Sequence, residues 1–154
     1  MNTAKLAYCA VTEHDFDTLA DLRAIAMRPS LERLGRYDPQ RSRERLRATF
    51  MPACTRAIEL DGRRIGFYTL RSLDGALRLD HLYLLPAECG RGLGSRVMAH
   101  IIGQAQAAGL PLRVGALRDS DSNRFYLRHG FVQTGETGWD IEYQRDHPRP
   151  QPAR

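Results

Sequence analysis

Two Asp-Gly pairs divide the middle of the chain into three extended runs, and this pattern limits the fold more than any other feature. The runs cover residues 55–60, 63–73 and 76–85, and the pairs between them are Asp61-Gly62 and Asp74-Gly75. Glycine accepts a positive φ without steric cost, so Asp-Gly between extended runs is a strong signal for a tight β-hairpin. The pattern predicts three successive antiparallel strands.

The N-terminal part predicts one strand followed by two helices. Residues 6–11 have the composition of a strand, and Thr12 with Asp15 resembles a capping box at the start of a helix. Apolar residues at helical spacing continue to about residue 27, so we expect this helix to end before Pro29. An Asp-Pro pair then opens a second, arginine-rich and largely solvated helix over 39–50.

The C-terminal part alternates helices and strands. Leu93, Val97, Ile101 and Ala105 lie four residues apart, which predicts an amphipathic helix that ends at Gly109. The remaining expected elements are a strand over 112–117, a helix over 120–129, and strands over 131–134 and 139–145.

The predicted order is β-α-α-β-β-β-α-β-α-β-β, an antiparallel meander that leads into a β-α-β crossover. We therefore expect an α/β (α+β mixed) fold with a mixed, mostly antiparallel sheet and helices on both faces. The 154 residues suit a single domain over 1–146. The Pro/Arg-rich tail, 147–154, is expected to be disordered.

Composition excludes several classes of protein. With 42% hydrophobic and 27% charged residues, the chain is typical of a soluble globular protein, and we expect neither a signal peptide nor a membrane segment. Cys9, Cys54 and Cys89 form no CxxC pair, which favours a reducing, cytoplasmic setting over a disulfide framework. The histidines show no metal-ligand spacing, so no metal is predicted.

The formal charge of +5 comes almost entirely from arginine. A basic surplus suits nucleic acid or a phosphorylated cofactor, although arginines scattered over a soluble surface are the simpler explanation. The arginines at 41, 43, 45 and 47 spread around a helix without interleaved aromatic residues. We therefore predict no nucleic-acid partner.

A glycine-rich turn, 90–94, joins the third strand of the meander directly to the long helix. Backbone N–H groups at a helix start lack intrahelical acceptors, and glycines let a pyrophosphate approach them closely. Arg91 can add a charge-assisted contact to a phosphate. The turn lacks the Lys-Ser/Thr of a Walker loop and the spacing of a dinucleotide fingerprint. A turn without a ligand remains the alternative.

The surrounding residues carry a family resemblance. Cys89-Gly90-Arg91-Gly92-Leu93-Gly94 resembles motif A of the GNAT superfamily of N-acetyltransferases, whose pattern is Gln/Arg-x-x-Gly-x-Gly/Ala. Residues 123–131 are similar to motif B, which typically ends in Phe-Tyr-x-x-x-Gly-Phe. The separation of the motifs and the order of the elements agree. Cys89 replaces the usual Gln or Arg, and Ser120 stands where the family often has Asn.

The resemblance implies direct transfer of an acetyl group from acetyl-CoA to a primary amine, with Tyr126 protonating the departing thiolate. A core position beside Phe125 is the alternative for Tyr126. The pantetheine arm is expected along the backbone of 82–84. The cofactor-binding residues that the resemblance implies are Leu82, Tyr83, Leu84, Cys89, Gly90, Arg91, Gly92, Leu93, Gly94, Ser95, Ser120, Asn123 and Tyr126.

The proton of the attacking ammonium needs a base, and Asp80 is favoured slightly over His81 on the strand that approaches the site. A structural role is an equal alternative for each. The resemblance places the acceptor pocket at about 15–50, for a small-molecule or peptide amine, and allows a homodimer. A non-catalytic module that binds or senses acyl-CoA is the second functional hypothesis.

Overall fold

The computed structural model describes residues 4–146, so the predicted tail lies outside the described residues. Within them the chain forms two compact units. The first comprises 4–71 and 79–94, and the second comprises 72–78 and 95–146. That the two units act as one domain stays a prediction.

The first unit contains the predicted meander. Its strands are β1 (Leu6–Ala10), β2 (Thr55–Leu60), β3 (Arg63–Leu73) and β4 (Ala76–Leu84), of which the outer end of the β3–β4 hairpin belongs to the second unit. β1 pairs antiparallel with β2, and β2 pairs antiparallel with β3. Asp61 and Gly62 have φ values of 50° and 84°, and Asp74 and Gly75 have 51° and 75°. Both Asp-Gly turns therefore adopt the left-handed backbone that the sequence predicts.

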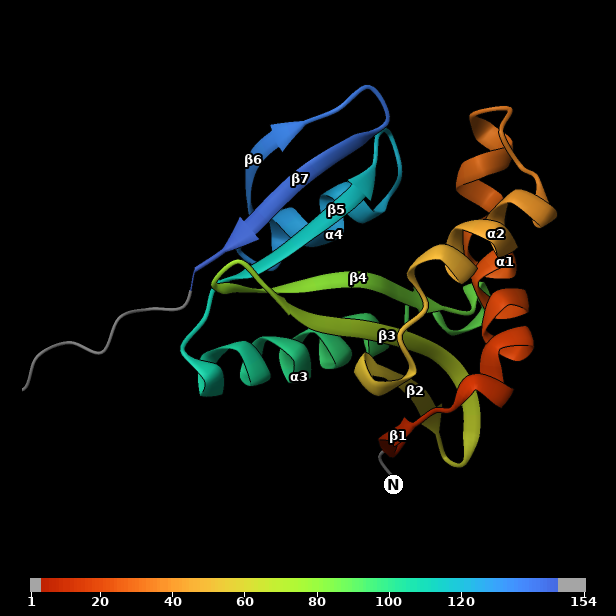
Figure 1. Ribbon diagram of the computed structural model, residues 1–154, viewed down its shortest axis with the longest axis horizontal. Coiled ribbons are helices and arrows are strands. Elements are labelled where there is room, and N and C mark those ends of the chain that lie inside the picture. The colour runs from red at the N-terminus through yellow and green to blue at the C-terminus, as the bar shows by residue number, and fades with distance from the viewer. Residues whose placement is uncertain (1–3, 147–154) are drawn as a thin grey trace, which may run out of the picture. The chain divides into compact units, whose positions relative to one another are not determined.

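Two helices of the first unit lie side by side, α1 (Phe16–Arg33) and α2 (Pro39–Thr49) (Figure 1). The capping box is confirmed, because Thr12 and Asp15 each bond the backbone N–H expected of them. Asp38 caps α2 by accepting from the N–H groups of Gln40 and Arg41. Short 3-10 turns cover Glu13–Asp15, Pro52–Cys54 and Pro86–Glu88.

The prediction that α1 ends before Pro29 is wrong. The helix contains Pro29 and continues to Arg33. It ends where Gly35 adopts a φ of 67° and the N–H of Arg36 donates to the carbonyl of Leu31 at 2.8 Å. A proline inside a helix removes one hydrogen bond, and α1 continues through that loss although its buried residues all lie at or before Arg23.

One apolar cluster holds the first unit together. Phe16, Leu19 and Leu46 from the helices meet Ala57 and Phe67 from the sheet, and all five are almost fully buried. Burial of this kind contributes about 25 cal/mol per Å² of apolar surface. The helices α1 and α2 are therefore fixed to the meander by their apolar faces.

The second unit is built from α3 (Leu93–Ala108), β5 (Leu112–Leu117), α4 (Ser122–Arg128), β6 (Val132–Glu136) and β7 (Asp140–Arg145), with the first two residues of α3 assigned to the other unit. β7 pairs antiparallel with both β5 and β6. Residues 76–78 of β4 also belong to this unit, and the strand order is β1-β2-β3-β4-β5-β7-β6. The predicted α/β fold with a mostly antiparallel sheet is confirmed.

Burial in the second unit follows the predicted periods. Val97, Ile101 and Ala105 of α3 are buried, and buried residues alternate along β5. Trp139 is an exception, because β7 begins after it and its side chain is 60% exposed. The prediction that Trp139 belongs to the last strand is therefore wrong. Among residues 4–146, no helix is long and apolar enough to cross a membrane.

At Gly66 the strands β3 and β4 approach each other closely. A Cβ atom built there would lie 2.1 Å from the carbonyl oxygen of Tyr83 on the neighbouring strand β4. Real Cβ atoms do not approach backbone oxygens so closely, so any other residue must push β3 and β4 apart.

We expect Gly66→Ala to lower the free energy of unfolding by about 1–3 kcal/mol, because the added methyl group clashes with backbone rather than with a movable side chain. Urea denaturation measures the change. Gly103→Ala is the matched control: Gly103 is exposed within α3 and a Cβ there meets nothing within 4 Å. This control should gain about 0.5–1 kcal/mol. Equal stability of Gly66→Ala and the parent would contradict the prediction.

Candidate active site

The glycine-rich turn links β4 to α3 through two left-handed glycines. Gly90 and Gly92 have φ values of 83° and 75°, and a Cβ at either would meet nothing within 4 Å. The turn is therefore open on the side where these side chains would stand. α3 starts at Leu93, so the last two residues of the predicted turn 90–94 already belong to the first turn of the helix, and its first N–H groups lie in the same segment. This geometry fits the close approach of a phosphate group to the backbone.

An acidic residue that the sequence analysis did not single out supports the turn. Glu88 is only 6% exposed, and its carboxylate accepts from Arg91 at 2.7 Å and from Arg63 at 3.3 Å. Arg91, predicted to contact phosphate, is thus paired within the turn while its side chain stays half exposed. A buried carboxylate needs such cationic partners. The arginine three residues after Glu88 is therefore the sequence feature that could have pointed to this ion pair.

Cys89 has no sign of a nucleophile. Its thiol is 3.6 Å from the carbonyl oxygen of Leu85. Partial burial and the nearby Glu88 carboxylate raise the pKa of the Cys89 thiol above its ordinary value. Because the thiolate is the reactive form, this environment favours a loop residue.

The strand residues Leu82, Tyr83 and Leu84 lead into the turn within the same unit and are all partly exposed. The following residue, Leu85, donates its N–H to the carbonyl of Ile65 at 2.8 Å. The predicted pantetheine strand and the predicted pyrophosphate turn are therefore consecutive parts of one compact unit.

Asp80 lies next to His81 on β4 and faces Arg71. Its two carboxylate oxygens accept from Nε and Nη2 of Arg71, the second at 3.3 Å. A proton placed on Asp80 would cost this two-pronged ion pair. The role of Asp80 as the general base stays a prediction. The ion pair with Arg71 is consistent with the alternative, a structural role for Asp80.

His81 belongs to a polar network that joins β4 to α1 and α2, and in this network His81, Arg23 and Ser42 are buried. Its Nδ1 lies 3.3 Å from the hydroxyl of Tyr83, and its Nε2 lies 2.8 Å from Oγ1 of Thr49. The Tyr83 hydroxyl accepts from Nε of Arg23 at 3.1 Å. Nη1 of Arg23 donates to the hydroxyl and the carbonyl of Ser42 at 2.6 and 3.0 Å.

The donors and acceptors of this network are consistent with one tautomer of His81. A guanidinium can only donate, so the proton of the Tyr83 hydroxyl is left for Nδ1 of His81. Nε2 then carries the ring proton and donates to Thr49, whose hydroxyl can donate to the carbonyl of Arg45 at 3.1 Å. When His81 is neutral, each hydrogen bond from the Tyr83 hydroxyl to the Thr49 hydroxyl has one donor and one acceptor.

Burial and the charge of Arg23 lower the pKa of His81 to about 4, while the carboxylate of Asp80 opposes them. A histidine in this state is a weak base, and its role in the network is to accept from Tyr83. The sequence left both a base and a structural role open for His81, since nothing in it signals the burial of this side chain.

Four predicted site residues lie in the second unit. Ser95 lies 3.0 Å from Nε2 of His129, whose Nδ1 contacts the carbonyl of Phe125 at 2.9 Å. Asn123 donates to the carbonyls of Leu117 and Ser120 at 3.0 and 2.9 Å. The hydroxyl of Tyr143 donates to Asn123 at 2.7 Å. The side chain of Asn123 therefore joins β5, α4 and β7.

Tyr126, the fourth, is 6% exposed and sits in an aromatic cluster. Its ring centroid lies 5.5 Å from that of Phe131 and 5.9 Å from that of Tyr143. This burial agrees with the alternative of a core position, and the acid role stays a prediction.

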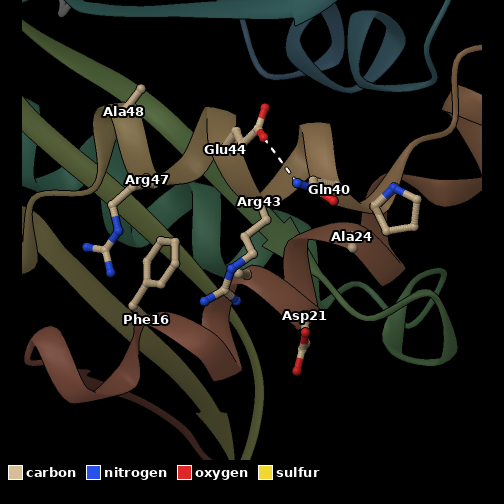
Figure 2. Close-up of a pocket in the computed structure, with 10 residues that line it drawn as sticks. Phe16, Asp21, Ala24, Gln40, Arg43, Glu44, Arg47 and Ala48 are labelled. Carbon is tan, nitrogen blue, oxygen red and sulfur yellow. Dashed lines mark hydrogen bonds between the residues drawn. The ribbon is translucent and has the colours of Figure 1, made fainter.

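Figure 2 shows an open groove between α1 and α2, with a volume of about 760 Å³. Arg43 and Arg47 both lie over the ring of Phe16, with centroid distances of 4.9 and 3.6 Å. Arg43 is also paired with Asp17, and Arg47 with Glu13. All the lining residues lie within 15–50, the region predicted to hold the acceptor pocket, whereas none of the predicted catalytic or cofactor-binding residues lines the groove. The charges of Arg43 and Arg47 are already neutralised by these ion pairs.

Residues 4–146 contain no group of three His, Cys, Asp or Glu side chains that could hold a metal ion. Cys9, Cys54 and Cys89 are free thiols.

The family model described as Acetyltransferase (GNAT) domain matches residues 53–133, more than half of the chain. The chain therefore belongs to the GNAT family of acetyltransferases. A comparison with curated protein sequences gave no match.

Solved structures show the same fold. The PaiA N-acetyltransferase from Thermoplasma acidophilum, in complex with coenzyme A, is similar with a TM-score of 0.76 and 16% identity over 93% of this chain and 99% of that one. An acetyltransferase from Thermus thermophilus is similar with a TM-score of 0.74 and 16% identity, and the match covers 94% of this chain and 99% of that one. A third similar structure is N-acetylglutamate synthase from Neisseria gonorrhoeae, complexed with coenzyme A and N-acetyl-glutamate. Its TM-score is 0.67 and its identity is 21%, over 94% of this chain and 35% of that one.

The lowered pKa of His81 predicts a pH-dependent stability. The unfolded state binds the His81 proton near pH 6.5, whereas the folded state does so near pH 4. The contribution of neutral His81 to the free energy of unfolding is fully present above pH 6.5. It is lost as the pH drops toward 4, and the loss amounts to about 3 kcal/mol in all. Urea denaturation between pH 7 and 4 should show that His81→Gln removes this part of the pH dependence.

The exposed His14 provides the control, since His14→Gln should keep the parent slope. A His81→Gln protein whose stability follows the parent curve over this range would contradict the prediction.

Proposed function

We propose that the protein is an acetyl-CoA-dependent N-acetyltransferase. The observation that carries the proposal is the left-handed glycine turn, placed directly between the strand residues Leu82–Leu84 and the first turn of α3. The open side of Gly90 and Gly92 fits a pyrophosphate, and bound coenzyme A in two of the similar structures supports this ligand.

In this proposal the turn and the strand bind the two ends of the cosubstrate. Backbone N–H groups of residues 90–95 receive the pyrophosphate, and the backbone of 82–84 lines the pantetheine arm. Acetyl-CoA supplies a thioester carbonyl, which the neutral amine of the acceptor attacks directly in a ternary complex. A backbone N–H near Leu84 polarises that carbonyl as an oxyanion donor does.

The carbon–sulfur bond breaks as the carbon–nitrogen bond forms, and the phenol of Tyr126 gives its proton to the leaving thiolate of CoA. The proton that the attacking nitrogen loses passes to a base or to a chain of water molecules. A tyrosine has an ordinary pKa of about 10 and is therefore a protonated donor at neutral pH. The acceptor is an amine, carried by a small molecule or a peptide. Location in the cytoplasm, a homodimer and the absence of a nucleic-acid partner stay predictions of the sequence.

Gly92→Ala tests the turn. Alanine at a φ of 75° costs about 1–2 kcal/mol, so the turn should relax and the Kd for CoA should rise about fivefold or more. Titration calorimetry with CoA measures the change. Gly103→Ala, within α3, should bind CoA as the parent does. Absence of CoA binding to the folded parent protein would refute the proposed function.

Tyr126→Phe tests the acid. We expect the Kd for CoA to be unchanged and kcat to fall about 100-fold, because the thiolate loses its proton donor. A thiol-release assay with acetyl-CoA and a panel of amines measures the turnover. Unchanged turnover would remove Tyr126 from the mechanism, and CoA binding without any turnover in the parent would favour the non-catalytic sensing module.

A further inference from the structure

Arg23 is a buried cation with no acidic partner. The residue is 6% exposed on α1, and it bonds only neutral groups, the Tyr83 hydroxyl and the two oxygen atoms of Ser42. No carboxylate within residues 4–146 lies at ion-pair distance from it. A buried charge of this kind is costly unless an anion compensates it.

One nitrogen of Arg23 remains available. Nε and Nη1 make the three hydrogen bonds of the network, while Nη2 has no acceptor among the described residues. In that part of the chain, no fully buried side-chain nitrogen or oxygen lacks a hydrogen-bond partner. Nη2 therefore keeps some exposed surface and can receive a further acceptor from outside the protein.

Other arginines of the two helices differ in this respect. Arg28 is more than half exposed and pairs with Glu32 at 2.7 Å. Arg43 and Arg47 in the groove of Figure 2 pair with Asp17 and Glu13. Their charges are neutralised by the protein itself, and only Arg23 combines burial with an uncompensated charge among these four.

The network also sets where a ligand of Arg23 would stand. Arg23 bonds the side chain of Tyr83, which belongs to the strand segment 82–84 proposed to line the pantetheine arm. The guanidinium carbon lies 5.5 Å from the centre of the Tyr83 ring. An anion on Nη2 is therefore held beside the strand along which the thioester is proposed to lie.

We propose that Arg23 binds the carboxylate of the acceptor, so that the acceptor is a small amino acid-type molecule with a carboxylate close to its amine. This inference rests on the proposed function and names the substrate class of that site. Ser42 and Tyr83 orient the guanidinium. His81 accepts from Tyr83 while it is neutral, and so keeps a second positive charge away from the carboxylate.

Matched acceptors test the inference in the parent protein. We choose alanine, glutamate and phenylalanine, each with its α-carboxamide and its decarboxylated amine, in a thiol-release assay with acetyl-CoA. At least one free amino acid should exceed its carboxamide and its decarboxylated amine at least about tenfold in kcat/KM, since a charge-assisted hydrogen bond is lost in the neutral forms. Equal rates for acids and amides would overturn the inference and leave the proposed function intact.

Variants separate recognition from folding. Arg23→Gln should raise KM for the preferred acid about tenfold or more and leave KM for its amide nearly unchanged, and Arg23→Lys should restore part of the loss. Arg28→Gln, on the same helix, should keep the parent preference. If Arg23→Gln lowers activity with acid and amide alike, Arg23 has only a structural role.

Binding provides a readout without turnover. Calorimetry on CoA-saturated protein, with the N-acetyl derivatives of the same amino acids and of their amides as probes, should show at least about tenfold tighter binding of at least one acid than of its amide. No preference for any acid, in either turnover or binding, overturns the inference. Failure of the protein to bind CoA at all would instead refute the proposed function.

Discussion

The position of Tyr83 is the constraint on which the rest of the first unit depends. Its backbone carbonyl lies so close to β3 that only glycine fits at position 66. Its hydroxyl joins Arg23 of α1 to His81 of β4. One residue therefore fixes the spacing of two strands and connects a helix to the sheet. The same residue lies in the strand segment that enters the glycine turn.

The distribution of charge separates the arginines by role. A half-exposed ion pair such as Arg28–Glu32 is screened by water and contributes little to stability. A buried guanidinium is different, because removal from water is expensive and neutral hydrogen bonds compensate only part of the cost. Arg23 is retained in this position with neutral partners, and that is why its location suggests recognition of an anion rather than support of the fold.

Local features of the fold followed from the sequence with good accuracy. Both Asp-Gly turns, the capping box at Thr12 and the buried face of α3 agree with expectation, because each depends on residues a few positions apart. Pro29 lies inside α1 rather than after it, because a proline removes one helical hydrogen bond and does not always end the helix. Trp139 lies just before β7 rather than in it, because the ends of a strand are less precisely defined by local sequence than its middle.

The sequence by itself determined the turns, the caps and the glycine segment that opens α3. Backbone conformation at these sites depends on the local residue types. Glycines, which permit a positive φ, can be read directly from the sequence. Only the tertiary structure decided which polar residues are buried and what they touch. Arg23 and Tyr83 are separated by 60 residues, and Thr49 and His81 by 32. Desolvation and hydrogen bonding arise where such distant segments pack together, so the network and its anion site became apparent only in the folded chain.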